Sequence, residues 1–431
     1  MRIIYGSLLA LLYILSFFKS YRMTKDIFSP MSFFSAIQLI AYVPGIILFK
    51  SHLGVDLDEW KTFVVFLMQV IVLVFTWLGV QAYKCVTAKR IFRYSLKTKV
   101  KRHMIFVGIV VYAIGFLSLI LFIKIHGGIS HIVTHSRISY GDGTSYLWSM
   151  QNLMVVGMLC FWGNKRRPNR LLLLISFGIY AAGMIIFTKR APILEALLLL
   201  VMGYNYRCRR FRVRDFLRPR SLLLILVFSA LVIALPKMRT AAGFNITTEE
   251  ILLGGMKQIA AVFEEFSYVS RDAFVYTHFN IGNMYYGRTV VNLLTAPLPS
   301  SLFPWKPPVD DGVYLCNYVW GHYVLPPTNV YPIQNSYPFS SQGSMYANFG
   351  LPGVVVGSVL TGLLYQCVYV LLKDSEYHVL SIFLYQMVIY KFGLSSKNII
   401  QTLVPIILAF LAFSMLAGLR VKRYRIQEDK T

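Results

Sequence analysis

The sequence predicts an all-α, polytopic membrane protein with about 11 transmembrane helices, within a range of about 10–12. Of its 431 residues, 56% are hydrophobic and 14% are charged, against roughly 25% charged residues in a typical soluble domain. Apolar runs recur from one end of the chain to the other. The net charge of +25 does not indicate nucleic-acid binding, because Lys and Arg lie in short segments between these runs.

The candidate spans divide the chain into three parts. Residues 1–236 form an N-terminal transmembrane bundle of about eight spans, 237–349 a large loop domain, and 350–431 the C-terminal helices with a basic tail. The first run lacks a small-x-small cleavage site, so we expect a retained span and not a signal peptide. A break near Pro192 separates two short helices, because proline suits a first helical turn. The apolar runs fall at about 3–18, 27–48, 62–82, 105–124, 148–163, 171–188, 193–206, 221–236, 350–372, 379–394 and 398–419.

The distribution of basic residues predicts the orientation. One alternate set of connecting segments, together with the C-terminal tail, holds 28 of the 43 Lys and Arg. Short cytoplasmic loops carry such an excess, so this set is predicted to be cytoplasmic, with the C-terminus inside and the N-terminus outside. The large loop between the eighth and ninth spans then faces away from the cytoplasm.

The large loop, 237–349, is the predicted site of function. Loops longer than about 12–15 residues without regular structure are usually functional or disordered, and its many Tyr, Phe and Trp argue against disorder. Thr247 and Glu250 form a capping box. An amphipathic helix is predicted after it, and 280–349 is predicted to be irregular with short helices. Its apolar stripe comprises Leu252, Met256, Ile259, Phe263 and Phe266.

Basic residues on the outer side are candidates for binding a lipid phosphate or pyrophosphate. Arginine recognises phosphate through a bidentate fork. The alternative is that these side chains reach lipid headgroups without a specific ligand. For Arg190 and Arg239 together we prefer the specific role. The candidates are Lys189, Arg190, Arg239, Arg271, Arg288 and, more weakly, Arg137.

Three residues could act as a general base. His278 and His322 each stand among aromatic residues, and a neutral imidazole can accept a proton from an attacking hydroxyl. Asp272 could serve as a base or orient Arg271. For each, a structural role in a hydrogen bond or a salt bridge is the alternative. The adjacent Asp310 and Asp311 could bind a divalent ion, but a Pro-rich turn explains them equally well.

The loop is also rich in aromatic side chains that suit sugar rings; an interfacial aromatic belt is the alternative. The candidates for glycan binding are Tyr285, Tyr286, Trp305, Trp320 and Tyr346. The sequence lacks a phosphate-binding G-x-x-x-x-G-K-[ST] loop and metalloprotease or serine-hydrolase motifs. Its five cysteines show no metal-ligand spacing. We therefore predict no metal and no cofactor.

Three segments resemble one family. TKRAPILEALLLL at 188–200, PLPSSLFPWKPP at 297–308 and GSMYANFGLPGVVVGSVLTGLLY at 343–365 are similar to segments of Wzy-type oligosaccharide repeat-unit polymerases, which include O-antigen polymerases. The resemblance covers about residues 180–370. Thr188 stands where the family often has glycine, and the first 170 or so residues match in hydropathy only.

The resemblance implies a GT-C-like glycosyltransferase of the bacterial inner membrane. Such an enzyme joins undecaprenyl-pyrophosphate-linked oligosaccharide units on the periplasmic face. Its expected partners are membrane lipid and a chain-length regulator protein. The outer arginines would stabilise the leaving pyrophosphate. The alternatives are an O-antigen ligase, a flippase for lipid-linked oligosaccharide, and a non-catalytic scaffold.

Overall fold

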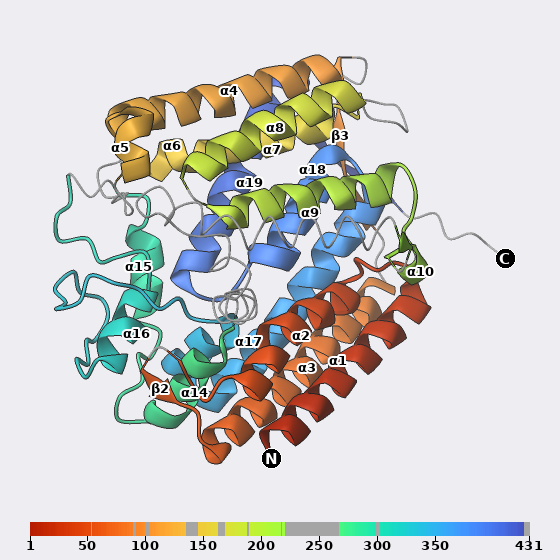
Figure 1. Ribbon diagram of the computed structural model, residues 1–431. Coiled ribbons are helices and arrows are strands. Elements are labelled where there is room, and N and C mark those ends of the chain that lie inside the picture. The colour runs from red at the N-terminus through yellow and green to blue at the C-terminus, as the bar shows by residue number, and fades with distance from the viewer. Residues whose placement is uncertain are drawn as a thin grey trace. The chain divides into compact units, whose positions relative to one another are not determined.

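A computed structural model describes residues 1–52, 54–88, 92–99, 103–134, 145–162, 169–187, 189–216, 218–219, 267–298 and 302–425. The described elements fold into two compact units, each built from separate parts of the chain. Both units are mainly helical (Figure 1).

The first unit begins with three helices that lie side by side (Figure 1), α1 (Arg2–Thr24), α2 (Pro30–Leu48) and α3 (Glu59–Ala88). A small hairpin of β1 (Ser51–His52) and β2 (Val55–Asp56) connects α2 to α3. From the large loop come α14 (Val269–His278), α15 (Thr289–Thr295) and α16 (Gly312–Val319). The unit is completed by α17 (Ser341–Asp374) as far as Cys367 and by Val388–Thr402.

The second unit contains α4 (Met104–Ile125) packed against α6 (Ser145–Met150) and α7 (Asn152–Cys160). Around them lie α5 (Gly128–Thr134), α8 (Arg170–Ile186), α9 (Arg190–Arg207) and α10 (Val213–Phe216). The unit also holds the end of α17, α18 (Val379–Gln386) and α19 (Ser396–Ala417) from Leu403. A π-helical turn, η1 (Met387–Lys391), follows α18.

Six of the described helices are long and apolar enough to cross a membrane: α1, α2, α3, α4, α17 and α19. Two shorter apolar helices cover Arg170–Ile186 and Val379–Lys391. These helices coincide with predicted apolar runs, as a polytopic membrane protein requires. The break near Pro192 is also present, since α8 ends at Ile186 and α9 begins at Arg190. The predicted span at 221–236 and the amphipathic stripe at 252–266 lie outside the described residues.

Glycines set the closest helix packing in the first unit. A Cβ atom added to Gly362 of α17 would lie 3.0 Å from the carbonyl carbon of Thr76 in α3, and one added to Gly79 would meet Val359 in the same way. Small residues let helix backbones approach closely in apolar surroundings. Nearer the start of α17, Gly350 has φ 64° and ψ −153° and interrupts the helix. That backbone conformation is one that glycine adopts without steric cost.

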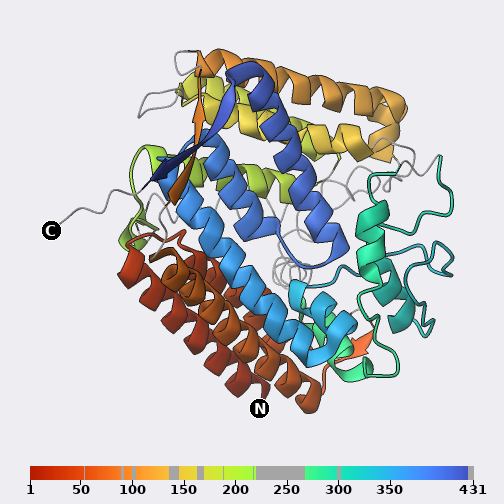
Figure 2. The ribbon, with the colours of Figure 1, turned by 180° about the vertical axis from the view of Figure 1, so that it is seen from behind.

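A two-stranded antiparallel ribbon is the main departure from the all-α prediction. It pairs β3 (Phe92–Thr98) with β4 (Leu419–Arg425), and the register joins Tyr94 to Arg423 and Lys97 to Arg420. Figure 2 shows the two strands crossing beside the end of α19. The prediction missed the ribbon because Lys and Arg occupy positions where an apolar alternation would identify a strand.

Candidate functional site

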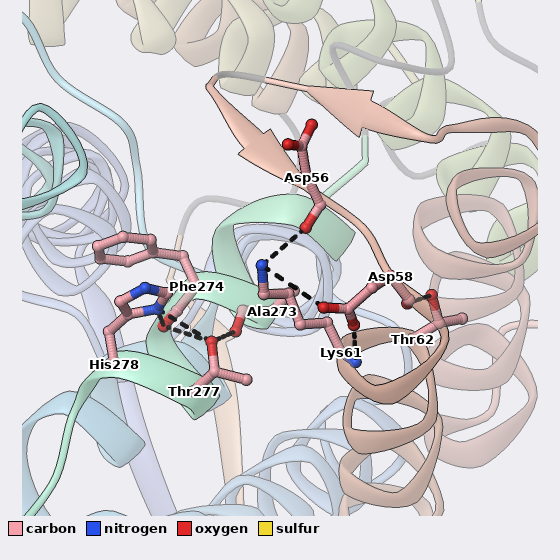
Figure 3. A network of polar contacts seen from close by, with 8 residues as sticks. All are labelled: Asp56, Asp58, Lys61, Thr62, Ala273, Phe274, Thr277 and His278. Atoms are coloured by element: carbon pink, nitrogen blue, oxygen red, sulfur yellow. Dashed lines mark hydrogen bonds and ion pairs between the residues drawn. The ribbon is translucent and has the colours of Figure 1, made fainter.

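His278, one of the three candidate bases, is the last residue of α14 and is exposed. Its ring stacks on Phe274 with centroids 4.1 Å apart, and Nδ1 lies 3.1 Å from the Phe274 carbonyl oxygen and 3.0 Å from Thr277 Oγ1 (Figure 3). A carbonyl oxygen can only accept a hydrogen bond. Nδ1 therefore carries the proton in the neutral ring, and the lone pair is on Nε2.

The hairpin β1–β2 borders the same helix (Figure 3). Asp58 caps the start of α3 by accepting a 2.6 Å hydrogen bond from the backbone N–H of Lys61. The Lys61 ammonium group donates to the Asp56 carbonyl oxygen at 3.0 Å. These contacts fix the hairpin against α3, beside which α14 packs.

Asn283 connects His278 to the neighbouring tyrosines. Its Nδ2 donates to the His278 carbonyl oxygen and to the Tyr318 hydroxyl, both at 2.8 Å. Its own carbonyl oxygen accepts from the Tyr323 hydroxyl at 2.8 Å. Tyr318 and Tyr323 also meet edge to face, with ring centroids 5.2 Å apart.

Arg288 and Tyr286 belong to the same surface. Arg288 is exposed. Burial raises the pKa of the Tyr323 phenol, and the nearby charge of Arg288 opposes part of that rise. The exposed Tyr286 hydroxyl donates to the Ile281 carbonyl oxygen. We call this surface the aromatic patch, comprising His278, Asn283, Tyr286, Arg288, Tyr318 and Tyr323.

The other predicted sugar-binding aromatics occupy different surroundings. Tyr285 is fully buried and meets Phe279 edge to face, so protein covers its ring. Trp305 and Trp320 are exposed, and Trp320 Nε1 donates to the Tyr337 hydroxyl at 3.0 Å. Tyr346 lies in α17, where it meets Tyr276 edge to face at 5.0 Å. Only Tyr286 of the five predicted residues belongs to the aromatic patch.

Asp272 lies in the interior of the first unit. Its two carboxylate oxygens accept hydrogen bonds of 2.6 Å from the Tyr42 hydroxyl of α2 and from the Ser340 hydroxyl. Gln342 in turn donates to the Tyr42 oxygen. The expected pairing with Arg271 is replaced by these bonds, because the Arg271 guanidinium donates to the carbonyl oxygens of Ser267 and Pro338.

Burial controls the ionisation of this carboxyl group. Loss of solvation raises the pKa of Asp272 to about 6, while the bonds from Ser340 and Tyr42 and the charge of Arg271 hold the rise back. Tyr276, one turn along α14, lies against the same group, and burial raises the pKa of its phenol well above the ordinary value. Arg271 is also buried, and its ring contact is with Tyr268, 4.2 Å from the guanidinium carbon. Asp272 and Arg271 are thus both enclosed by protein.

A second buried carboxyl group, Asp311, lies at the start of α16. One of its oxygens accepts from the Ser396 backbone N–H at 3.2 Å and from the Ser344 hydroxyl at 3.5 Å. The other, Oδ1, has no hydrogen-bond partner among the described residues. Burial, followed by the neighbouring charge of Asp310, raises the pKa of Asp311 to about 7.

Asp310 is the half-buried member of the pair. Its carboxylate binds the Lys397 ammonium group and accepts from the Gly312 backbone N–H at 3.1 Å. Both acids therefore link the large loop to the start of α19. No group of three His, Cys, Asp or Glu suited to holding a metal occurs among the described residues.

The segment Ser340–Ser344 connects the two buried carboxyl groups. Ser340 and Gln342 reach the Asp272 network, whereas Ser344 reaches Asp311. A Cβ atom at Gly343 would lie 2.6 Å from an Asp272 oxygen, so a side chain there would have to displace the Asp272 carboxylate. The segment that resembles the family begins at Gly343, and the sequence prediction missed Tyr42, Ser340, Gln342 and the burial of Asp311. For Ser340 and Gln342, the only local signal is an unusual density of small polar residues at a helix start.

The remaining predicted residues are dispersed. His322 is exposed next to Tyr323. Lys189 and Arg190 begin α9 of the second unit, while Arg239 and Arg137 lie outside the described residues. In the PLPSSLFPWKPP segment, the Lys306 ammonium group donates to the carbonyl oxygens of Ala296 and Leu298, at 2.8 and 2.7 Å. It thereby caps the end of α15.

Together these features define a helical membrane protein with an exposed aromatic and cationic surface on its large loop. Comparisons with protein-family models, with curated proteins and with solved structures found no match.

Proposed function

We propose that this protein is a membrane glycosyltransferase that polymerises undecaprenyl-pyrophosphate-linked oligosaccharide units into O-antigen or a related surface polysaccharide. The observation that carries the proposal is the aromatic patch. It combines an imidazole with a lone pair on Nε2, a guanidinium group and tyrosine rings on an exposed part of the loop. These are the groups that a sugar acceptor and a pyrophosphate leaving group require.

In the proposed reaction, a hydroxyl group of the acceptor sugar attacks the anomeric carbon of the donor. The new C–O bond forms as the bond to the lipid pyrophosphate breaks, and the pyrophosphate leaves with the electron pair. His278 Nε2 accepts the hydroxyl proton. Arg288 stabilises the charge that develops on the pyrophosphate.

The proposal places the large loop on the periplasmic side of the bacterial inner membrane, within a GT-C-like arrangement of about 11 spans. Its orientation rests on the excess of Lys and Arg in the opposite set of loops. Membrane lipid and a chain-length regulator protein are the expected neighbours.

The buried Asp272 then serves to position α14 and is not the base, because protein donors occupy both of its oxygens.

A ligase and a flippase are the main alternative functions, and deletion of the gene distinguishes them in a lipopolysaccharide-producing strain. Loss of a polymerase leaves lipid A core carrying a single repeat unit. Loss of a ligase or a flippase leaves bare core, and loss of a scaffold changes only the chain length. We expect the single-unit product. Bare core would contradict the proposal.

Purified protein provides the direct test. In proteoliposomes containing lipid-pyrophosphate-linked repeat units, the enzyme should produce a ladder of longer lipid-linked glycans without added nucleotide sugar. Transfer to lipid A core in place of a ladder would assign the protein as a ligase. No product would remove the catalytic proposal.

A further inference from the structure

The ribbon β3–β4 is strongly basic. Neither strand contains Asp or Glu, and its described side chains include five positive charges: Arg93, Lys97, Arg420, Lys422 and Arg423. Within the second unit, the half-buried Lys97 also lies 3.8 Å from Glu376, whose side chain is exposed to solvent. Because neither strand supplies a carboxylate of its own, the ribbon itself carries only basic charge.

The ribbon is attached to the ends of apolar helices. Gly418, with φ 59°, separates the last residue of α19, Ala417, from the first residue of β4. At the other strand, β3 ends at Thr98 and α4 begins at Met104, a separation that the chain can extend over at most about 20 Å. Both α19 and α4 are long and apolar enough to cross a membrane.

A third connection comes from the turn after α17. The Leu96 backbone N–H donates to Ser375 Oγ at 2.9 Å, and Thr98 Oγ1 lies 3.4 Å from His378 Nε2. Ser375 directly follows Asp374, the last residue of α17. The base of the ribbon is therefore fixed at the ends of helices that would enter the bilayer. A ribbon of seven residues per strand extends about 23 Å from such a base.

The ribbon also exposes apolar side chains between its charges. Tyr94 and Val421 are 49% and 64% exposed. Residues directly opposite in an antiparallel pair share a face, so the register places Tyr94 and Arg423 on the same face as Val421. Alternating apolar and basic side chains at a membrane boundary suit insertion among lipid headgroups.

We propose that the β3–β4 ribbon lies along the membrane surface and binds anionic phospholipid headgroups. Its arginines and lysines contact the phosphates, and Tyr94 and Val421 rest at the acyl boundary. This interaction is independent of the glycan chemistry proposed above. It fixes the C-terminal strand to the leaflet on the side where α19 ends.

The test uses hydrogen–deuterium exchange of the full-length protein in lipid nanodiscs. Peptides covering β3 and β4 are compared in phosphatidylcholine alone and in phosphatidylcholine with phosphatidylglycerol. We expect several-fold slower exchange in the ribbon when the anionic lipid is present. The protection should weaken in about 1 M salt, where the Debye length falls to roughly 3 Å.

A pair of double variants assigns the effect to the ribbon. Lys422→Gln with Arg423→Gln removes two exposed charges from β4 and should abolish the lipid-dependent protection. Arg212→Gln with Arg214→Gln removes two exposed charges from the segment around α10 and should leave it intact. Equal exchange in the two bilayers would overturn the proposal. Protection that appears only on adding a short RNA would overturn it too, by assigning the ribbon to a soluble polyanion.

Discussion

The Tyr42 hydroxyl of α2 donates a 2.6 Å hydrogen bond to the buried carboxylate of Asp272 in α14, across 230 positions of the chain. Together with the bond from Ser340, it fixes the first turn of α14 against the helices of the first unit. His278, six residues further on, is about 120° round the helix from Asp272. Anchoring the buried face of α14 therefore sets the direction in which His278 faces solvent.

Removing the Tyr42 hydroxyl tests this anchor. Tyr42→Phe leaves a buried carboxylate oxygen without its donor, which typically costs about 1–3 kcal/mol. We expect a lower thermal midpoint for the purified protein in detergent. Asp272→Asn should also destabilise, but the double variant should lose less than the sum of the two single changes because they remove one shared interaction. Strict additivity would show that the two groups do not interact.

Ionisation of Asp311 predicts a pH dependence of stability. Its pKa in the folded protein is about 7, above the ordinary 3.8, so the folded state binds this proton more tightly than the unfolded state does. The stability that this proton binding contributes is fully present below about pH 4 and is lost as the pH rises through about 7. A shift of this size corresponds to roughly 4 kcal/mol as an upper figure.

Asp311→Asn cannot ionise, so we expect its thermal midpoint, relative to the unmodified protein, to increase between pH 4 and pH 8. His378 has the opposite effect, because burial lowers its pKa to about 4 and stability is lost as the pH falls from about 6.5. Because His378 is present in both proteins, its contribution cancels when the thermal midpoint of the parent is subtracted from that of the variant. A difference that is constant with pH would show that folding does not raise the pKa of Asp311.

Hydropathy located the long helices because membrane insertion is a local property of about 20 consecutive residues. The same reasoning placed the break near Pro192, which depends on one residue's backbone restriction. By contrast, the Tyr42–Asp272 bond joins distant segments, and neither residue carries a local sign of its partner. Burial changed the interpretation of Asp272 in the same way, since a carboxylate beside an arginine in the sequence usually indicates a surface pair.

The candidate site was predicted in part. His278, Arg288 and Tyr286 were selected from the sequence, and the structure brings them to one surface through Asn283 and Tyr323. Asn283 was missed because an asparagine in a Gly-rich turn ordinarily bonds to its own backbone. The position of Lys189 and Arg190 at the start of α9 agrees with the predicted break.

Close packing of α3 and α17 predicts strong sensitivity at Gly362. Alanine there would place a methyl group against the backbone of Thr76 and Val80, and overpacking of this kind costs about 1–3 kcal/mol. We expect Gly362→Ala to lower the thermal midpoint and the yield of folded protein. Gly178 of α8 has no atom within 4 Å of an added Cβ, so Gly178→Ala is the matched control. Equal effects of the two changes would refute the packing argument.

His278 is the residue on which the proposed chemistry depends. His278→Gln preserves a polar side chain but cannot accept a proton, and general-base assistance is typically worth about 10²–10⁴-fold. We expect the rate of glycan transfer in proteoliposomes to fall by about that factor, while the thermal midpoint remains unchanged. His322→Gln provides the comparison, with an expected loss of no more than a few-fold. If neither variant slows transfer appreciably, proton transfer to the leaving pyrophosphate is the better mechanism.

The two sides of the membrane can be tested by labelling single cysteines in a parent whose five native cysteines are replaced. Val330 in the large loop and Val421 in β4 are 77% and 64% exposed, so cysteine at either position is accessible to reagent. If the loop faces the periplasm, Val330→Cys should react with an impermeant maleimide on whole cells whose outer membrane has been permeabilised. Val421→Cys should react only after the inner membrane is opened.

Tyr94→Cys must behave as Val421→Cys does, since β3 pairs with β4. Reversed labelling of Val330 and Val421 would invert the orientation and exclude a periplasmic reaction, whereas different labelling of Tyr94 and Val421 would contradict the ribbon itself.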